Sequence, residues 1–175
     1  MRGTKAALNG EWVRRVLKEH EAPLLRYAAR LSGNLESARD LVQDTFLRLC
    51  SEDPEQLGER VAPWLYRVCR SRAVDAFRKE HRMKPLEDAA LEMLESAAPT
   101  PIEALDRRET ESLVLKALSA LPKNQQEVIR LKFQEGFSYR EISEVTGHSV
   151  SNVGFLIHAG MKTLRQRLAG SPAGV

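Results

Sequence analysis

The sequence of 175 residues has few cysteines, few aromatic residues and no long apolar run. Its two cysteines, Cys50 and Cys69, form no CxxC pair and have no histidines at zinc-site spacing, so neither a disulfide framework nor a metal site is predicted. We expect both to be buried, reduced thiols. No segment approaches the roughly 20 apolar residues of a membrane helix, and no signal-peptide pattern opens the chain. These absences argue against secreted and membrane-inserted classes and predict a cytoplasmic protein.

Charge is nearly balanced, with 27 basic and 24 acidic residues and a formal net charge of +3. This composition permits a nucleic-acid partner without requiring one. Because 42% of the residues are hydrophobic, the chain has enough apolar side chains for one compact domain or two small ones. The distribution of charge along the chain therefore has to decide between function classes.

Apolar residues recur at three- and four-residue steps and strand-like alternation is scarce, so we predict an all-α fold. The first two helices are predicted to meet near Pro23, with the second ending at Gly33 and Asn34 capping the next. That next helix has a predicted buried stripe of Leu35, Ala38, Leu41, Val42, Thr45 and Leu49. A loop is predicted at 53–58, followed by a helix over 63–82 that buries Leu65, Val68, Cys69, Ala73, Ala76 and Phe77.

Acidic residues dominate the stretch 86–111, which Pro99 and Pro101 interrupt. Two prolines so close together oppose a continuous helix, so an acidic linker is predicted. We therefore predict two small helical domains, residues 1–84 and 108–175, joined by a linker over 85–107.

The carboxy-terminal part carries the clearest local signals. Ser138 and Glu141 have capping-box spacing, and Phe137 with Ile142 has hydrophobic-staple spacing, so a helix is predicted to start there. Gly147 ends it and Ser149 is placed to cap another helix. A packing face is predicted before and after the motif from Leu113, Ala117, Leu118, Leu121, Val128, Ile129, Leu131, Phe133, Val150, Val153, Ile157 and Leu164.

Helix, tight turn and helix is the pattern of a DNA-binding helix-turn-helix, whose second helix enters the major groove. The outward candidates are Ser151, Asn152, Phe155 and His158, with Lys162, Arg165 and Arg167 further along. A helical hairpin used only for packing is the alternative for this segment.

One face of the predicted helix 63–82 carries Arg67, Ser71, Asp75, Arg78 and Arg82, with Arg70, Arg72 and Lys79 beside it. Trp64 and Tyr66 lie at its start. Cations that hold a backbone next to rings on which bases stack are typical of single-strand binding. A merely solvated charged face is the alternative.

Taken together, these motifs resemble the extracytoplasmic-function (ECF) sigma factors. Residues 38–49 (ARDLVQDTFLRL) resemble the family's core-binding helix of region two, and residues 63–68 (PWLYRV) resemble the start of its promoter-melting helix. Residues 118–167 are similar to region four. The three motifs stand in the family's order and spacing, in a chain of the family's size.

The resemblance implies a non-enzymatic subunit without a cofactor that binds core RNA polymerase and promoter DNA. Contacts with the β′ clamp helices are implied for Asp40, Gln43, Asp44 and Leu47. Contacts with the melted minus-ten strand are implied for Trp64, Arg67, Ser71, Asp75, Arg78 and Lys79, with the loop 56–62. Contacts with the minus-thirty-five duplex are implied for Ser149, Ser151, Asn152, Phe155, His158 and Lys162. The polymerase β flap and an anti-sigma factor are further candidate partners.

The sequence departs from the family in both DNA-facing helices. Ser71 stands where many relatives have Asn, which removes an amide from the minus-ten surface. Where relatives often carry Thr, Lys and two Arg, this chain has Asn152, Gly154, Leu156 and Ala159. Fewer phosphate contacts lower affinity and salt sensitivity rather than sequence preference. Phe155 and Leu156 are also candidates for a protein-binding surface.

Two other classes are weighed against the sigma factor. A dimeric helix-turn-helix regulator accounts for residues 138–168 but leaves 40–82 unexplained, and copurification with core polymerase separates the two. An enzyme is opposed by the absence of a glycine-rich phosphate loop, and by four histidines, His20, His81, His148 and His158, that lack metal or triad spacing.

Overall fold

The computed structural model describes residues 2–80 and 109–169, and the chain divides into two compact units, residues 1–100 and 101–175. Every regular element in the described ranges is a helix, which confirms the predicted all-α fold. The predicted linker, residues 85–107, lies outside the described residues, so its bounds stay predictions. In the described part of the chain, no helix is both long and apolar enough to cross a membrane.

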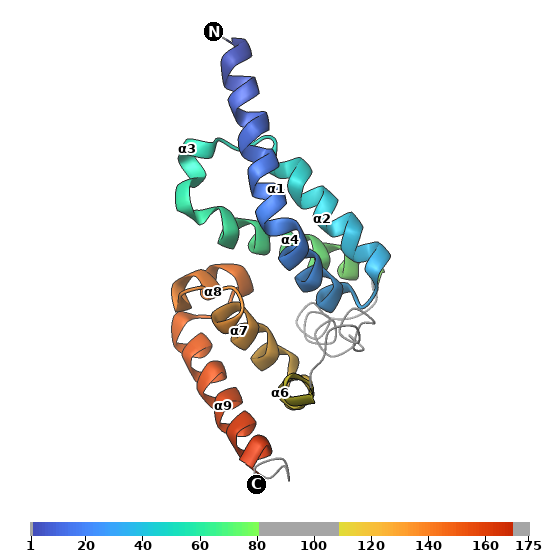
Figure 1. Cartoon of the computed structure of the whole chain (residues 1–175), viewed down its shortest axis with the longest axis vertical. Coiled ribbons are helices and arrows are strands. Elements are labelled where there is room, and N and C mark those ends of the chain that lie inside the picture. Colours follow the sequence, from blue (N-terminus) through green and yellow to red (C-terminus); the bar gives the residue numbers. More distant parts are fainter. Residues whose placement is uncertain (1, 81–108, 170–175) are drawn as a thin grey trace. The chain divides into compact units, whose positions relative to one another are not determined.

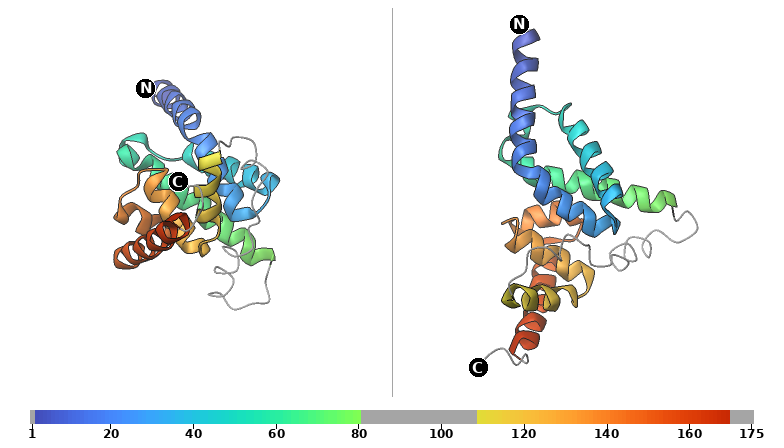
Figure 2. Two further views of the ribbon diagram at one scale, coloured as in Figure 1. Left: turned by 60° about the horizontal axis from the view of Figure 1, so that its bottom comes forward. Right: turned by 45° about the vertical axis from the view of Figure 1, so that its right-hand side comes forward.

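The amino-terminal unit is built on three packed helices, α1 (Arg2–Ser32), α2 (Leu35–Leu49) and α4 (Val61–Glu80). In Figure 1, α1 and α2 run antiparallel as a hairpin, and α4 crosses them and contacts both. Leu24, Ala38, Leu49, Leu65 and Cys69 lie in the core between them. The amino-terminal end of α1 extends beyond the other helices of this unit, as Figure 2 also shows.

Helix α1 runs unbroken through Pro23, so the predicted division into two helices at this residue was wrong. Proline removes one helical hydrogen bond and clashes with the preceding turn. However, Val16 on one side of it and Leu24, Tyr27 and Ala28 on the other are all buried. Packing of both halves on the other helices outweighs the local preference for a break.

The α1–α2 connection follows the sequence prediction. Gly33 adopts a positive φ of 75°, which a left-handed helix end requires and which glycine adopts without strain. The Asn34 side chain accepts a hydrogen bond from the Ser37 backbone N–H at 2.7 Å and caps α2. The predicted stripe of α2 is buried apart from Leu35, which is half-buried, and Phe46 joins it.

The predicted loop at 53–58 is instead a short ordered connection. It consists of α3 (Pro54–Leu57) and a 3₁₀ turn, η1 (Gly58–Arg60), which lead directly into α4. Asp53 caps α3 by accepting from the Glu55 N–H at 3.1 Å, and Leu57 is buried beneath it. Helix α4 therefore begins two residues before the predicted start, and its described part ends at Glu80.

The carboxy-terminal unit contains α6 (Glu109–Ser119), α7 (Lys123–Phe133), α8 (Tyr139–Thr146) and α9 (Val150–Ala169). Helix α9 contacts the other three, and Leu118, Leu121, Ile129 and Leu164 form a buried cluster. Gly160 allows α9 to approach α7 closely, because a Cβ at this position would lie 2.5 Å from Ile129 Cδ1. Two residues of the predicted packing face were assigned wrongly, since Phe133 and Val150 are exposed.

Candidate functional site

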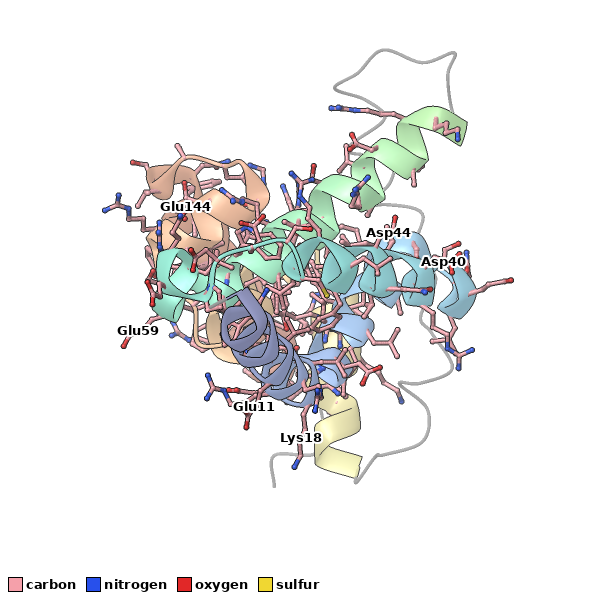
Figure 3. All side chains as sticks on the ribbon, turned by 90° about the horizontal axis from the view of Figure 1, so that it is seen from above. Glu11, Lys18, Asp40, Asp44, Glu59 and Glu144 are labelled. Carbon is pink, nitrogen blue, oxygen red and sulfur yellow. The ribbon has the colours of Figure 1, made fainter. Side chains whose placement is uncertain are left out.

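The outward face of α2 carries the four residues predicted to bind polymerase. Asp40, Gln43, Asp44 and Leu47 are all exposed, and their i, i+3, i+4, i+7 spacing places them on one side of the helix. Figure 3 shows Asp40 and Asp44 pointing outward together from α2. Leu47 has 61% of its surface exposed, so this face combines carboxylates with an apolar side chain.

Behind this face, a buried polar pair joins α2 to α4. The hydroxyl of Thr45 donates to the Leu41 carbonyl at 2.7 Å, and the Cys69 thiol is hydrogen-bonded to Thr45. Burial raises the pKa of Cys69 to about 12, an effect that its hydrogen bond with Thr45 only partly offsets. Cys69 thus matches the predicted buried thiol, but Cys50 at the end of α2 is exposed and contradicts it.

The outward face of α4 carries most of the residues predicted to hold the minus-ten strand. Arg67, Ser71, Asp75, Arg78 and Lys79 are all exposed and follow one stripe of the helix. Cations therefore lie at both ends of a solvent-facing stripe of about three turns, with the hydrogen-bonding groups between them. Arg82, predicted for the same stripe, lies outside the described residues.

Trp64 and Tyr66 do not belong to this surface. Trp64 is 9% exposed and Tyr66 is 1% exposed, and the Tyr66 ring packs on Tyr27 with a centroid separation of 4.9 Å. The prediction that these rings offer faces for base stacking, and with it the assignment of Trp64 to the minus-ten surface, was therefore wrong. The rings instead fill the core that supports the stripe, because α1 covers this side of α4.

A cleft of about 510 Å³ brings the two surfaces of the amino-terminal unit together. Asp40 and Asp44 from α2 line it opposite Arg72, Asp75 and Lys79 from α4. Arg72 had been placed only at the flank of the predicted strand-binding face, because its position beside the α2 carboxylates depends on how the two helices pack. Predicted polymerase-binding and DNA-binding residues thus share one cleft.

In the carboxy-terminal unit, α8 and α9 are joined by a short, well-bonded turn. Ser138 and Glu141 form the predicted capping box, with the Ser138 N–H donating to Glu141 at 2.7 Å and the Glu141 N–H to Ser138 Oγ at 3.2 Å. Gly147 ends α8 with a φ of 78°. The Ser143 hydroxyl then donates to the His148 carbonyl at 2.7 Å, which fixes the turn between the two helices.

Helix α9 presents every residue predicted for the minus-thirty-five surface to solvent. Ser149 caps the helix by accepting from the Asn152 N–H at 3.2 Å, while Val153, Ile157 and Leu164 pack inward. The residues left exposed are Ser149, Ser151, Asn152, Phe155, His158 and Lys162. Leu156 is buried, so the suggestion that it forms a protein-binding surface with Phe155 was wrong.

Two aromatic side chains with exposed surface lie next to the helix-turn-helix, and one of them, Phe133, was wrongly predicted to be buried. Phe133 at the end of α7 is 61% exposed, and Tyr139 at the start of α8 is partly exposed. The Lys132 ammonium lies 5.5 Å from the Tyr139 ring centroid, and the same ring lies against Gly154 of α9. The sequence did carry a signal that Phe133 need not be buried, because it lies at the end of a helix and polar residues follow it.

The family comparisons match both units of the chain. A model described as Sigma-70 region 2 matches residues 16–83, and one described as Sigma-70, region 4 matches residues 111–164. The ECF RNA polymerase sigma factor SigL of Mycobacterium tuberculosis is 31% identical over 169 residues, covering 93% of this chain and 92% of that protein. The chain belongs to the ECF sigma factor family. It is therefore a sigma factor, which directs transcription initiation.

Other relatives of this ECF sigma factor agree. The RNA polymerase sigma factor SigV of Bacillus subtilis is 26% identical over 153 residues, covering 87% of this chain and 88% of that protein. The sigma factor RpoE of Bartonella quintana, solved in complex with the anti-sigma factor NepR, shares the fold with a TM-score of 0.63. It is 23% identical, and the match covers 90% of this chain and 97% of that chain.

The family match decides between the classes weighed from the sequence. The region 2 match includes α2 and α4, the segment that a simple helix-turn-helix regulator leaves unexplained. The duplex-binding regulator is therefore not favoured. Sigma factors, the family to which this chain belongs, are non-catalytic regulators of transcription.

Proposed function

We propose that three surfaces of this sigma factor divide its work: α2 docks on polymerase, α4 holds the melted minus-ten strand, and α9 reads the minus-thirty-five duplex. One observation carries the proposal. Each of these helices keeps a stripe of predicted contact residues exposed while its opposite face packs into a core. The stripes are therefore available to partners without any unfolding of the unit that presents them.

The α2 surface suits a protein partner better than DNA. Asp40 and Asp44 repel phosphate, whereas the exposed Leu47 offers apolar area beside them. By family likeness the partner is the pair of clamp helices in the polymerase β′ subunit. A basic and partly apolar surface on that partner would complement both kinds of side chain.

The α4 surface suits an unpaired strand held mainly by its backbone. With Trp64 and Tyr66 buried, Arg67, Arg78 and Lys79 supply phosphate contacts, and Ser71 and Asp75 offer hydrogen bonds to bases. Flipping a base costs a few kcal/mol, which this surface has to return. Attachment to polymerase, and to the duplex through α9, raises the effective concentration of the strand at α4.

Further partners and the cellular site follow from the same role. The polymerase β flap is a candidate contact of the carboxy-terminal unit, and an anti-sigma factor is a candidate inhibitor, as for the solved relative. Exposed apolar side chains such as Leu47 and Val114 are suitable points for such protein contacts. We place the protein in the cytoplasm, where RNA polymerase acts.

The test is transcription with the full-length chain as the sole sigma factor on purified core polymerase. We expect runoff products from a promoter library to come from templates that share two spaced elements. The variant Asp40→Ala/Asp44→Ala should bind core polymerase about tenfold more weakly, since it loses two interface charges.

The matched control is Glu11→Ala/Glu19→Ala, which removes two exposed acids from α1. In Figure 3, Glu11 projects from α1, away from Asp40 and Asp44. This control should bind polymerase as the unmodified chain does. Failure of the unmodified chain to associate with core polymerase would refute the proposal.

A further inference from the structure

We propose that the ring of Phe155 contacts the C5 methyl group of a thymine in the major groove of the minus-thirty-five element. Recognition of that element then depends on one thymine methyl. The inference rests on the proposed function of α9. It adds to that function the chemical group, a thymine methyl, that one position of the duplex has to present.

Phe155 is exposed to an unusual degree for its type. With 67% of its surface exposed, it is the most exposed large apolar side chain among the described residues. Aromatic rings are normally buried, and a ring held in water suggests a partner that covers it. Within the described part of the chain, the Tyr27–Tyr66 ring pair and the Lys132–Tyr139 cation–π contact do not involve Phe155.

The side chains around Phe155 indicate the chemistry of that partner. Ser151 and Asn152 lie one turn before it, His158 and Lys162 lie one and two turns after it, and all four are exposed. Hydroxyl, amide and imidazole groups are suited to base edges, and an ammonium to phosphate. The thymine methyl is the apolar group that a base pair presents in the major groove, and phenylalanine is among the side chains that contact it.

An extended protein surface fits these neighbours less well. Phe155 and Leu156 would have formed an apolar pair on the helix, but Leu156 is buried in the core. The exposed residues one turn away from Phe155 along α9, Ser151, Asn152 and His158, are instead all polar. The cores of protein interfaces are depleted of charged residues, whereas a DNA-reading helix combines polar, cationic and single apolar contacts.

The packing of α9 fixes which face of the helix carries Phe155. Ser149 caps the helix, and Val153, Leu156 and Ile157 are buried on the side away from Phe155. The turn at Gly147 adopts a φ of 78° and sets where α9 begins. Phe155 lies in the second turn of the helix, close to the end that a helix-turn-helix presents to base edges.

The experiment uses the full chain bound to core polymerase and a promoter identified by runoff transcription. Each thymine of the minus-thirty-five element is replaced in turn by deoxyuridine, which lacks only the C5 methyl. We expect a loss of about fourfold in promoter binding at one position, as for burial of a single methyl-sized group. The variant Phe155→Ala should bind the unmodified promoter more weakly and show no further loss with deoxyuridine.

Phe133→Ala is the matched control, because it removes an aromatic ring of similar exposure from the end of α7 in the same unit. It should keep the full response to deoxyuridine. A methyl response that persists in Phe155→Ala, or no response at any thymine of the unmodified holoenzyme, would overturn the inference while leaving the proposed function intact. Unchanged promoter binding by Phe155→Ala with weakened polymerase binding would overturn it in favour of a protein contact. A holoenzyme that initiates at no promoter would refute the proposed function, and this inference with it.

Discussion

Helices α4 and α9 have the same length, 20 residues each, but they place opposite kinds of side chain inside and outside. In α4, the rings of Trp64 and Tyr66 lie in the core and arginines face solvent. In α9, a glycine, Gly160, lies against the neighbouring helix and the ring of Phe155 faces solvent. The two helices are therefore built for different tasks.

The difference indicates how each surface achieves recognition. A row of cations binds any phosphate backbone and loses affinity as salt rises, so α4 should contribute strength more than sequence preference. The contacts made by hydrogen-bonding groups around one apolar ring depend on which base edge is present. Helix α9 should therefore contribute more to sequence preference than to affinity. The cations of α9 fit this division, because Lys162, Arg165 and Arg167 lie toward its far end and not among the polar groups of its first two turns.

The two thiols of the amino-terminal unit test how firmly α4 is held, and here we expect the largest effect. Burial raises the pKa of Cys69 from its ordinary value of 9.0 to about 12, so its thiolate population at pH 8 should fall about a thousandfold. In Cys50→Ser, alkylation should be slow until the unit unfolds. In Cys69→Ser, the exposed Cys50 should react readily, and mass spectrometry distinguishes the two.

The raised pKa of Cys69 also predicts how the stability of the amino-terminal unit depends on pH. Because the folded state keeps Cys69 protonated, its contribution to stability is fully present below pH 9 and is lost as pH rises toward 12. Urea unfolding of Cys69→Ser should lack this alkaline loss. Rapid alkylation of Cys69 in the folded chain would show that α2 and α4 pack less closely than described.

The charge of α4 provides the next largest effect. Arg67→Ala/Arg78→Ala should reduce open-complex formation about a hundredfold, if each lost contact is worth about tenfold. The salt dependence of promoter binding by this variant should also fall. The slope of log affinity against log salt concentration should decrease by about 0.7 for each lost single-strand phosphate contact. Core polymerase binding should be largely retained, because neither residue belongs to the α2 surface.

Arg15→Ala/Arg26→Ala removes the same charge from exposed positions on α1 and serves as the control. It should leave promoter opening near that of the unmodified chain. Equal losses in the two double variants would mean that net charge, and not the α4 stripe, assists opening. That result would remove the contrast drawn between α4 and α9.

Local signals in the sequence predicted those helix ends that have a side-chain cap or a glycine turn, because a cap needs only a few neighbouring residues. Asn34, Ser138 and Gly147 perform the roles that their types and spacing indicated. The helix-turn-helix and the exposed stripes of α2, α4 and α9 could therefore be predicted from spacing alone.

The errors arose where a distant helix decides the outcome. Pro23 favours a break, but α2 and α4 pack on both halves of α1 and keep it continuous. Trp64 and Phe133 have similar apolar character, yet the first is covered by neighbouring helices and the second lies at a helix end with little to cover it. Periodicity gives the faces of a helix, but burial of a given ring depends on tertiary contacts.

The close packing beneath α9 gives the smallest expected effect and tests whether its orientation matters. Gly160→Ala would place a methyl group 2.5 Å from Ile129 Cδ1, so the buried end of the isoleucine side chain would have to shift. We expect the variant to lower the free energy of unfolding of the carboxy-terminal unit by about 1–3 kcal/mol, as measured by urea denaturation. Cys69 protection in the amino-terminal unit should not change.

Ile129→Val removes the Cδ1 atom that would clash and supplies the control. Alone, this variant should lower the free energy of unfolding by about 0.5–1.5 kcal/mol. Combined with Gly160→Ala, it should recover stability, so that the effects of the two changes are less than additive. Promoter preference should recover along with stability, because α9 then returns to its place against α7. Recovered stability with a permanently altered preference would mean that the exact depth of α9, and not only the identity of its exposed residues, sets which duplex it reads.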